Sequence, residues 1–257
     1  MSDIITDRSG SILRIQLNRP TRKNAMTSAM YVGLADLLNQ ALSDEGIRAV
    51  LWHAAGDAFC AGNDVEDFLK NPLEAGETPQ SRLMKAFLSL DKPLIAAVQG
   101  FAVGGGATML THCDFVYAAE SAKFQMPFIN LALVPEFGTS WSLPAHVGYL
   151  RAAELILLGI PYDARRALEL GLVTSVVPDQ ALLTTATRTA QKLANLPSDA
   201  LRACKRLMRQ SYREQIEKAM RLENDEYPPR LRSADAKEAL TAFLERRPPN
   251  FARAAVS

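Results

Sequence analysis

The sequence is poor in cysteine and histidine and has almost no net charge. Its three cysteines, Cys60, Cys113 and Cys204, lie far apart among the 257 residues and form no CxxC pair. That spacing argues against a zinc site and against a disulfide framework, and it suits a reducing compartment. The 29 basic residues balance 28 acidic ones, so no overall field attracts nucleic acid or an anionic membrane.

Long apolar runs and targeting segments are also missing. No stretch approaches the roughly 20 apolar residues that a membrane span requires. The first ten residues, MSDIITDRSG, contain neither the apolar core of a signal peptide nor an Arg-rich amphipathic run. We therefore expect a cytoplasmic protein without a membrane or nucleic-acid partner. With 48% hydrophobic and 22% charged residues, the composition is that of an ordinary globular protein.

The first two thirds of the chain alternate between strand and helix patterns. Apolar or alternating segments predict strands at 11–18, 47–54, 93–103 and 114–118. Between the first two of these, leucine and methionine residues at helical spacing predict a helix from Met30 to Ala41. Strand–loop–helix units of this kind indicate an α/β core with parallel strands.

The last part of the sequence is helical. Ser198 and Ser233 are expected to cap two of its helices. The apolar faces of these helices need a surface to pack on, which either the core or a neighbouring subunit provides. We divide the chain accordingly into a core, residues 1–196, and a C-terminal helical region, residues 197–257. The helices are predicted at 182–196, 198–208, 214–226 and 233–244.

Two segments with small residues each follow an apolar strand. In Phe59–Asp64 (FCAGND), Ala61 and Gly62 allow the backbone to approach a ligand closely. Gly104-Gly105-Gly106 lies between a predicted strand and a helix, and free N–H groups at a helix N-terminus favour an oxyanion. A tight turn without a ligand is the alternative for each segment, but their joint occurrence favours a binding role.

These segments resemble those of the crotonase (enoyl-CoA hydratase/isomerase) superfamily. FCAGND is similar to its first oxyanion loop, and Gln99–Gly106 (QGFAVGGG) to its second. Asn18–Met26 (NRPTRKNAM) resembles the family's N-terminal coenzyme A segment, and Ala167–Val173 (ALELGLV) its later A-x-x-x-G-L-V motif. The resemblance implies an α/β spiral core of repeated ββα units, which is the acyl-CoA-binding and catalytic part. It also implies a helical C-terminal trimerisation region and a thioester enolate intermediate.

The resemblance also assigns site residues. The oxyanion donors are the N–H groups of Asn63 and Gly105. Coenzyme A is part of the substrate, so we expect neither a separate cofactor nor a metal, and we expect a homotrimer or a hexamer of two trimers. Simple solvent exposure is the alternative for Arg22 and Lys23, and core packing is the alternative for Phe128. The residues expected to bind substrate are Arg22 and Lys23 at the phosphates, the backbone of Ala61, Gly62, Asp64 and Val65, the second-loop residue Gly104, and Phe128 in the acyl pocket.

The residues that would carry hydration are absent. Hydratases of this family use two glutamates, because water must lose a proton while the α-carbon gains one. Thr108 and Phe128 occupy those two positions here, and neither transfers protons at neutral pH.

One acidic residue lies in a motif that indicates a catalytic role. Pro127–Gly138 (PFINLALVPEFG) resembles the Δ3,Δ2-enoyl-CoA isomerase branch, in which the glutamate of Pro-Glu is the single base. By that resemblance the base is Glu136. A single carboxylate is enough, because it can take a proton from C2 and return one at C4. The alternative role is that of an acidic residue preceding a helix predicted at 140–146.

Other ionisable side chains are expected to be structural or exposed. Glu66 and Asp67, which follow the first oxyanion loop, are expected to face solvent. The remaining candidates for a base are expected to be structural histidines, namely His53, His112 and His146.

We therefore expect a Δ3,Δ2-enoyl-CoA isomerase that acts in fatty acid or related acyl-CoA metabolism. A second hypothesis is an enoyl-CoA hydratase or another crotonase reaction on a specialised acyl-CoA. A third is a non-catalytic acyl-CoA-binding protein, which the loss of both hydratase glutamates would allow.

Overall fold

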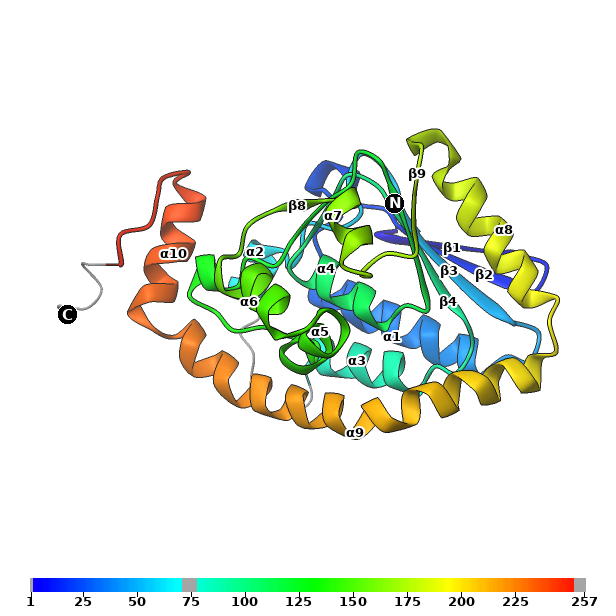
Figure 1. The fold of residues 1–257 in the computed structure, drawn as a ribbon. Helices are drawn as coiled ribbons and strands as arrows, with labels where there is room; N and C mark the ends of the chain where they lie inside the picture. The colour runs from blue at the N-terminus through cyan, green and yellow to red at the C-terminus, as the bar shows by residue number, and fades with distance from the viewer. Residues whose placement is uncertain (1, 71–77, 252–257) are drawn as a thin grey trace.

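The computed structural model describes residues 2–70 and 78–251. Its strands gather in a layered α/β body, and a long helix runs along one side of that body (Figure 1). The described part of the chain begins at the sheet, and α10, near its other end, lies far from the helix α8 (Figure 1).

Six strands form the main sheet, in the order β1-β2-β3-β4-β6-β9. The antiparallel pair β1–β2 lies at one edge, and the other neighbours pair in parallel. The first of these strands escaped sequence analysis, because its alternating residues are mostly exposed and polar. The strands are β1 Ile4–Ser9, β2 Ile12–Leu17, β3 Ala49–Ala54, β4 Leu94–Val98, β6 Phe115–Ala119 and β9 Ser175–Val177.

A second, smaller sheet contains β5 (Phe101–Val103), β7 (Lys123–Gln125) and β8 (Tyr162–Asp163). Consecutive strands alternate between the two sheets: β4 is followed by β5, and β6 by β7. The chain therefore winds as a spiral of ββα turns, which confirms the predicted crotonase-type α/β class.

The single strand predicted at 93–103 is wrong, because the chain turns between β4 and β5. Gly100 lies at this turn with a φ of 56°, a conformation that residues with a side chain rarely adopt. A Cβ atom at Gly100 would lie 1.8 Å from the carbonyl oxygen of Asp57. The turn therefore depends on glycine, and it sends the chain from the main sheet into the second one.

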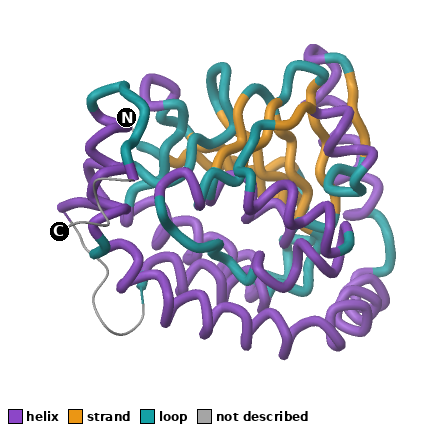
Figure 2. Tube along the Cα trace, turned by 60° about the vertical axis from the view of Figure 1, so that its left-hand side comes forward, coloured by secondary structure: helices purple, strands orange, loops and turns teal. Residues whose placement is uncertain are grey.

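Helices cover both faces of the main sheet. The central strand β3 is buried throughout, and its alternate residues face two different cores. Val50 and Trp52 belong to the larger core, which also contains residues of α1 (Ser28–Ser43) and α3 (Pro79–Ser89). Ala49 and Leu51 belong to the smaller core beneath α8 (Leu182–Ala194). Figure 2 shows the strands enclosed between helices.

Short helices connect these layers. Two of them matter for the site, because α4 begins at the second oxyanion loop and α5 follows Glu136. The short helices are α2 Val65–Lys70, α4 Gly105–Thr108, α5 Thr139–Val147, α6 Tyr149–Leu157 and α7 Ala164–Glu169, and the 3-10 turns are η1 Pro20–Arg22, η2 Met109–His112, η3 Ile129–Leu131 and η4 Asp179–Ala181.

The two helices predicted at 198–208 and 214–226 are one helix, α9 (Ser198–Leu231), of 34 residues. The intervening residues 209–213 (RQSYR) contain neither glycine nor proline, so nothing there ends the helix. Ser198 is not the cap, because Pro197 precedes the first turn and no side chain caps it. The cap predicted for α10 (Ala234–Leu244) is confirmed: the Ser233 hydroxyl accepts the N–H of Ala236 at 3.1 Å.

Ion pairs hold α9 against the core, and the one made by Lys205 is largely buried. Lys205, which is 5% exposed, donates to the Asp114 carboxylate and to the Lys92 carbonyl oxygen, both at 2.6 Å. Asp91 accepts from Arg202 at 2.9 Å and from Arg206 at 2.7 Å. These contacts fix the start of α9 beside α3 and η2. Within the described ranges, no helix is long and apolar enough to cross a membrane.

Candidate active site

The segment predicted to bind coenzyme A is held against the loop predicted to be the first oxyanion loop. Asn24 is completely buried, and its amide donates to the carbonyl oxygens of Ala55 and Ala58 at 2.8 and 2.7 Å. Next to it, Met26 forms a parallel bridge with Asn63. Asn24 was missed in the sequence, because an asparagine in a polar loop gives no sign that its side chain will be buried.

The second oxyanion loop lies directly against the first. Cys60 and Ala102 form a parallel bridge, in which the Val103 N–H donates to the Cys60 carbonyl oxygen at 2.9 Å. A Cβ atom placed on Gly62 would lie 3.0 Å from the Val103 carbonyl oxygen and 4.0 Å from the Gly104 Cα atom. Two glycine-bearing segments that are far apart in the sequence therefore meet, as the oxyanion-hole prediction requires.

The backbone leaves one N–H group on each loop available. In the Met26–Asn63 bridge, the peptide groups on both sides of Asn63 pair with Met26, so the N–H of Asn63 itself points away from that partner. Gly105 is the first residue of α4, and the first N–H groups of a helix have no intrahelical acceptor. In the part of the chain that the structure describes, neither N–H has a hydrogen-bond acceptor.

The Glu136 carboxyl group lies beside Gly105. A Cβ atom placed on Gly105 would be 3.0 Å from Glu136 Oε1 and 3.0 Å from the Tyr31 hydroxyl. Glu136 Oε1 is buried and has no hydrogen-bond partner among the described residues. This oxygen is therefore available to accept a proton from a ligand held at the amide of Gly105.

The surroundings of Glu136 tune its acidity. Burial, together with the nearby Glu223 carboxyl, raises the pKa of its carboxyl group from an ordinary 4.5 to about 7. A hydrogen bond with the Asn63 side chain acts in the opposite direction. A pKa near neutrality is suitable for a general base, which must be ionised at working pH and still bind a proton well.

Sequence analysis missed Tyr31, which joins the two halves of this site. Its hydroxyl donates to Asn63 Oδ1 at 2.6 Å, and its ring stacks on Phe137 with 6.2 Å between ring centroids. Burial raises the pKa of the Tyr31 phenol well above its usual value, and the Glu136 charge adds to this. Tyr31 sits on the buried face of α1, where the sequence pattern indicates only a core residue.

The charged residues predicted to bind coenzyme A are exposed but already paired. Arg22 lies 3.0 Å from Glu66, and Lys23 lies 2.6 Å from Asp57. Asp64 differs, because its carboxylate is buried and accepts the N–H groups of Glu66 and Asp67 at the start of α2. Its side chain is therefore a helix cap.

Arg19 completes the ion pairs of this segment. It donates to the Asp64 carboxylate at 3.0 Å, and the pKa of Asp64 is lowered by the hydrogen bonds from Asp67 and Arg19 despite its burial. The prediction that both Glu66 and Asp67 face solvent holds for Glu66 but not for Asp67, which accepts the N–H and hydroxyl of Ser28 at 2.8 Å.

The two positions of the hydratase glutamates are buried. The Thr108 hydroxyl donates to the Gly105 carbonyl oxygen at 3.4 Å, so it ties α4 together. Phe128 is 5% exposed and belongs to the larger core, at the start of η3. Neither position therefore supplies an ionisable group to the site.

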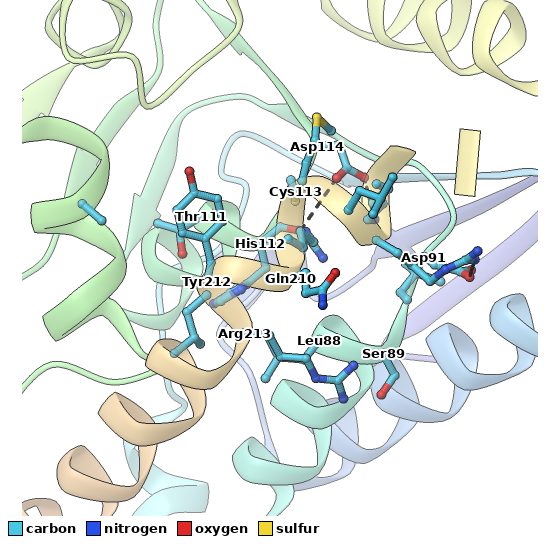
Figure 3. Close-up of a pocket in the computed structure, with 18 of the residues that line it drawn as sticks. Leu88, Ser89, Asp91, Thr111, His112, Cys113, Asp114, Gln210, Tyr212 and Arg213 are labelled. Atoms are coloured by element: carbon cyan, nitrogen blue, oxygen red, sulfur yellow. Dashed lines mark hydrogen bonds and ion pairs between the residues drawn. The ribbon is translucent and has the colours of Figure 1, made fainter. Parts of the chain in front are cut away.

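A cavity of about 700 Å³ lies between α3, η2, α5 and α9 (Figure 3). Asp91, Asp114, His112 and Tyr212 are on its wall (Figure 3), and the two aspartates are among the residues that anchor α9. Neither oxyanion loop nor Glu136 lines this cavity, so it does not mark the predicted reaction centre.

Comparison with known proteins places this geometry in a family. Residues 7–254 match the family model described as enoyl-CoA hydratase/isomerase. The chain is 36% identical to the 1,2-epoxyphenylacetyl-CoA isomerase of Escherichia coli over 98% of each protein. It is 32% identical to the enoyl-CoA delta isomerase 2 of Rattus norvegicus, over 95% of this chain and 64% of that protein. Further relatives that are 30% to 35% identical are named as hydratases.

A solved structure supports the same family assignment. The crystal structure of an enoyl-CoA hydratase/isomerase from Pseudoalteromonas atlantica superimposes with a TM-score of 0.93 and is 41% identical, covering 97% of this chain and 100% of that one. Matches of this extent, together with two adjoining loops whose N–H groups are free, leave one conclusion. The chain belongs to the enoyl-CoA hydratase/isomerase family of the crotonase superfamily.

Proposed function

We propose that the chain is a Δ3,Δ2-enoyl-CoA isomerase in which Glu136 is the single base. One observation carries this proposal: the buried Glu136 Oε1 lies beside Gly105 without a hydrogen-bond partner among the described residues. If the carbonyl oxygen of a thioester binds the N–H of Gly105, a carboxylate oxygen in that position can reach the acyl carbons C2 and C4.

In the proposed reaction, Glu136 takes a proton from C2 of a β,γ-unsaturated thioester. The electron pair of the broken C–H bond moves into the conjugated system, and the negative charge collects on the thioester oxygen. The N–H groups of Asn63 and Gly105 hold that oxygen. Glu136 then returns a proton at C4, which leaves an α,β double bond and restores the carboxylate.

The two N–H groups would supply most of the electrostatic stabilisation. Removing one donor from a hole of this kind typically costs roughly 2.7–4 kcal/mol of barrier. Tyr31 supports one of them, because its hydroxyl bond to the Asn63 side chain holds the first loop in place. Water is kept from the carboxylate by the same packing that raises its pKa to about 7.

Hydration has less support. It requires water to be deprotonated while C2 is protonated, and the family's hydratases use two glutamates for this. Here the corresponding positions are Thr108 and Phe128, both buried and neither acidic. Glu223 is the only further carboxylate that influences the pKa of Glu136 in the described part of the chain, and it is engaged with backbone N–H groups.

The substrate's nucleotide end is proposed to lie over the N-terminal segment. Arg22 and Lys23 are exposed there, and each would exchange its carboxylate partner for a phosphate. Gly104 lies close to Gly62 of the first loop, and the backbone of 61–65 is proposed to bind the adenine and pantetheine groups. Phe128 remains a proposed part of the acyl pocket.

The proposal is tested by giving the enzyme a β,γ-enoyl-CoA and, separately, an α,β-enoyl-CoA. Isomerisation creates the absorbance of a conjugated thioester, whereas hydration removes it. Growth of that absorbance with the first substrate, and no loss with the second, is the expected result. If the absorbance falls with the α,β substrate and never grows with the β,γ one, the enzyme is a hydratase.

A second candidate is isomerisation of a specialised acyl-CoA. The relative from Escherichia coli that is 36% identical is named 1,2-epoxyphenylacetyl-CoA isomerase, and that name indicates a ring-type acyl group. The same base and oxyanion hole would serve such a substrate. Turnover of 1,2-epoxyphenylacetyl-CoA, followed by mass spectrometry and chromatography of the isomers, distinguishes it from turnover of an aliphatic β,γ-enoyl-CoA.

We also propose that the chain assembles into trimers, or into pairs of trimers. Support comes from large apolar side chains that stay exposed on and after α6: Tyr149 at 72%, Leu150 at 83%, Leu157 at 60% and Leu158 at 59%. A monomer seldom leaves so much neighbouring apolar surface in water. A partner subunit would bury it.

A further inference from the structure

The turn that carries Glu136 is held by a residue from the far end of the sequence. Glu223, on α9, is 5% exposed. Its Oε2 atom accepts the N–H of Gly138 and its Oε1 atom accepts the N–H of Ser140, both at 2.7 Å. These are N–H groups at the start of α5, which has no side-chain cap of its own because its N-cap residue is Gly138. A carboxylate 85 residues away therefore caps the helix that follows the base.

The capped turn has an unfavourable backbone conformation. Phe137 has a φ of 60° and Gly138 a φ of 70°, and a bulky residue rarely adopts a positive φ unless its surroundings enforce it. The Phe137 carbonyl oxygen accepts a hydrogen bond from His112 Nε2 at 2.9 Å. Burial lowers the pKa of His112 to about 3, so this histidine is a neutral donor. His112 and Glu223 thus bond to the two sides of one peptide group, the Phe137 carbonyl oxygen and the Gly138 N–H, directly after Glu136.

One face of α9 lies against this turn. A Cβ atom placed on Gly138 would be 2.8 Å from Ile216 and 3.6 Å from Met220. Glu223 follows on the same face, and then Tyr227, whose pKa is raised by burial and by the Glu136 charge. Residues 216, 220, 223 and 227 follow the spacing of one helical stripe. Through this stripe, α9 packs apolar side chains against the turn and places the Glu223 carboxylate next to it.

We propose that Glu223 is a positioning residue, which fixes the turn 136–138 so that the Glu136 carboxyl stays beside Gly105. The proposal deepens the isomerase proposal and rests on it in taking Glu136 as the base. It makes the position of α9 a condition for catalysis, although no residue of α9 need touch the reacting atoms.

Electrostatics give Glu223 a second effect. Several groups face the Glu136 carboxyl: Tyr31 from α1, Cys60 and Asn63 from the first loop, and Glu223 and Tyr227 from α9. Glu223 is the acidic group among them that raises the pKa of Glu136. Removing its charge therefore lowers the pKa of Glu136, and loosening the turn lowers it too, because water then reaches the carboxylate.

The test compares Glu223→Gln and Glu223→Ala with the matched control Glu214→Gln, an exposed glutamate of the same helix. The Glu136 carboxyl is titrated by isotope-edited infrared spectroscopy, with Glu136→Gln identifying its band. Steady-state kinetics on the β,γ-enoyl-CoA are measured across pH. Circular dichroism checks folding. If Glu223→Ala does not fold, the test relies on Glu223→Gln alone.

In Glu223→Gln, the Glu136 titration and the acidic limb of the kcat profile are expected to move to lower pH. A misplaced reacting group costs up to about 100-fold, so kcat is expected to fall roughly 10- to 100-fold while KM stays within about twofold. Glu223→Ala should lose more, since Gln still accepts one N–H. The control should match the wild type.

The two proposals fail in different ways. If the wild type isomerises and folded Glu223→Gln leaves both the Glu136 titration and kcat unchanged, Glu223 merely stabilises α5 and the positioning role is overturned. If the wild type isomerises no β,γ-enoyl-CoA but Glu223→Gln still shifts the Glu136 titration, the isomerase proposal falls. The control of Glu136 by α9 is then supported.

Discussion

Replacing Glu136 by Gln should remove activity and at the same time stabilise the folded protein at alkaline pH. Gln keeps the size of the side chain but cannot take the C2 proton. General acid–base catalysis contributes roughly 10²- to 10⁴-fold, so kcat for isomerisation should fall by at least about 100-fold. Coenzyme A binding should change little, because we propose that it depends on backbone groups and on the region of Arg22.

The stability effect follows from the raised pKa of Glu136. The folded protein holds its proton with a pKa of about 7, against an ordinary 4.5. The stability that this group contributes is therefore fully present below about pH 4.5 and is lost as the pH rises through about 7. Since one pKa unit corresponds to about 1.36 kcal/mol, the ionised carboxylate costs the wild type up to about 3 kcal/mol at pH 8. Gln is neutral throughout and avoids that cost.

The assay is urea unfolding of wild type and Glu136→Gln between pH 5 and pH 8, at one protein concentration, because any assembly makes apparent stability depend on concentration. The advantage of the variant should grow by about 2–3 kcal/mol over that interval. Glu120→Gln, at an exposed position, serves as the control and should show no such growth. If the difference in unfolding free energy between Glu136→Gln and wild type were independent of pH, the inference that the Glu136 carboxylate is desolvated would be refuted.

Four further results are expected. In the wild type, kcat should rise with pH through about 7 and then level off, as ionisation of Glu136 requires; a flat profile between pH 5 and 8 would contradict the assignment of the base. Gly105→Ala should fold but lose most kcat, because its Cβ would lie 3.0 Å from both Glu136 Oε1 and the Tyr31 hydroxyl; a variant with normal kinetics would count against the site. Gly106→Ala should instead lower the free energy of unfolding by about 1–3 kcal/mol or more, since its Cβ would lie 2.4 Å from the Cys60 carbonyl oxygen. Urea denaturation of the two glycine variants measures this difference. Light scattering should give three or six times the 28.1 kDa chain mass, and a monomer at micromolar concentration would exclude the proposed assembly.

Much of the fold could be predicted because local pattern and global structure agree. The buried strand β3 and the amphipathic helix α1 have the periodicities that their environments demand. The errors occurred where a single residue changes the direction of the chain or where nothing interrupts it. Gly100 divides one apolar run between two sheets, and the uninterrupted run 209–213 lets two predicted helices join into α9.

The sequence by itself determined the family, the two loops predicted to form the oxyanion hole and the missing hydratase glutamates, because each can be recognised from a short stretch of sequence. Glu136 could be named for the same reason, from its Pro-Glu motif. Its free Oε1 atom and the contribution of Glu223 to its raised pKa could not be predicted, since they depend on residues that surround it in space.

Only the tertiary structure decided which distant residues serve the site. Tyr31 bonds to an asparagine 32 residues away, and Glu223 caps a turn 85 residues away. In the sequence, Tyr31 looks like any other residue on the apolar face of its helix. Glu223 looks like any other charged residue of a different helix. Their roles arise from close packing, which brings a hydroxyl and a carboxylate out of water and against particular backbone and side-chain groups, where unpaired polar atoms would be costly.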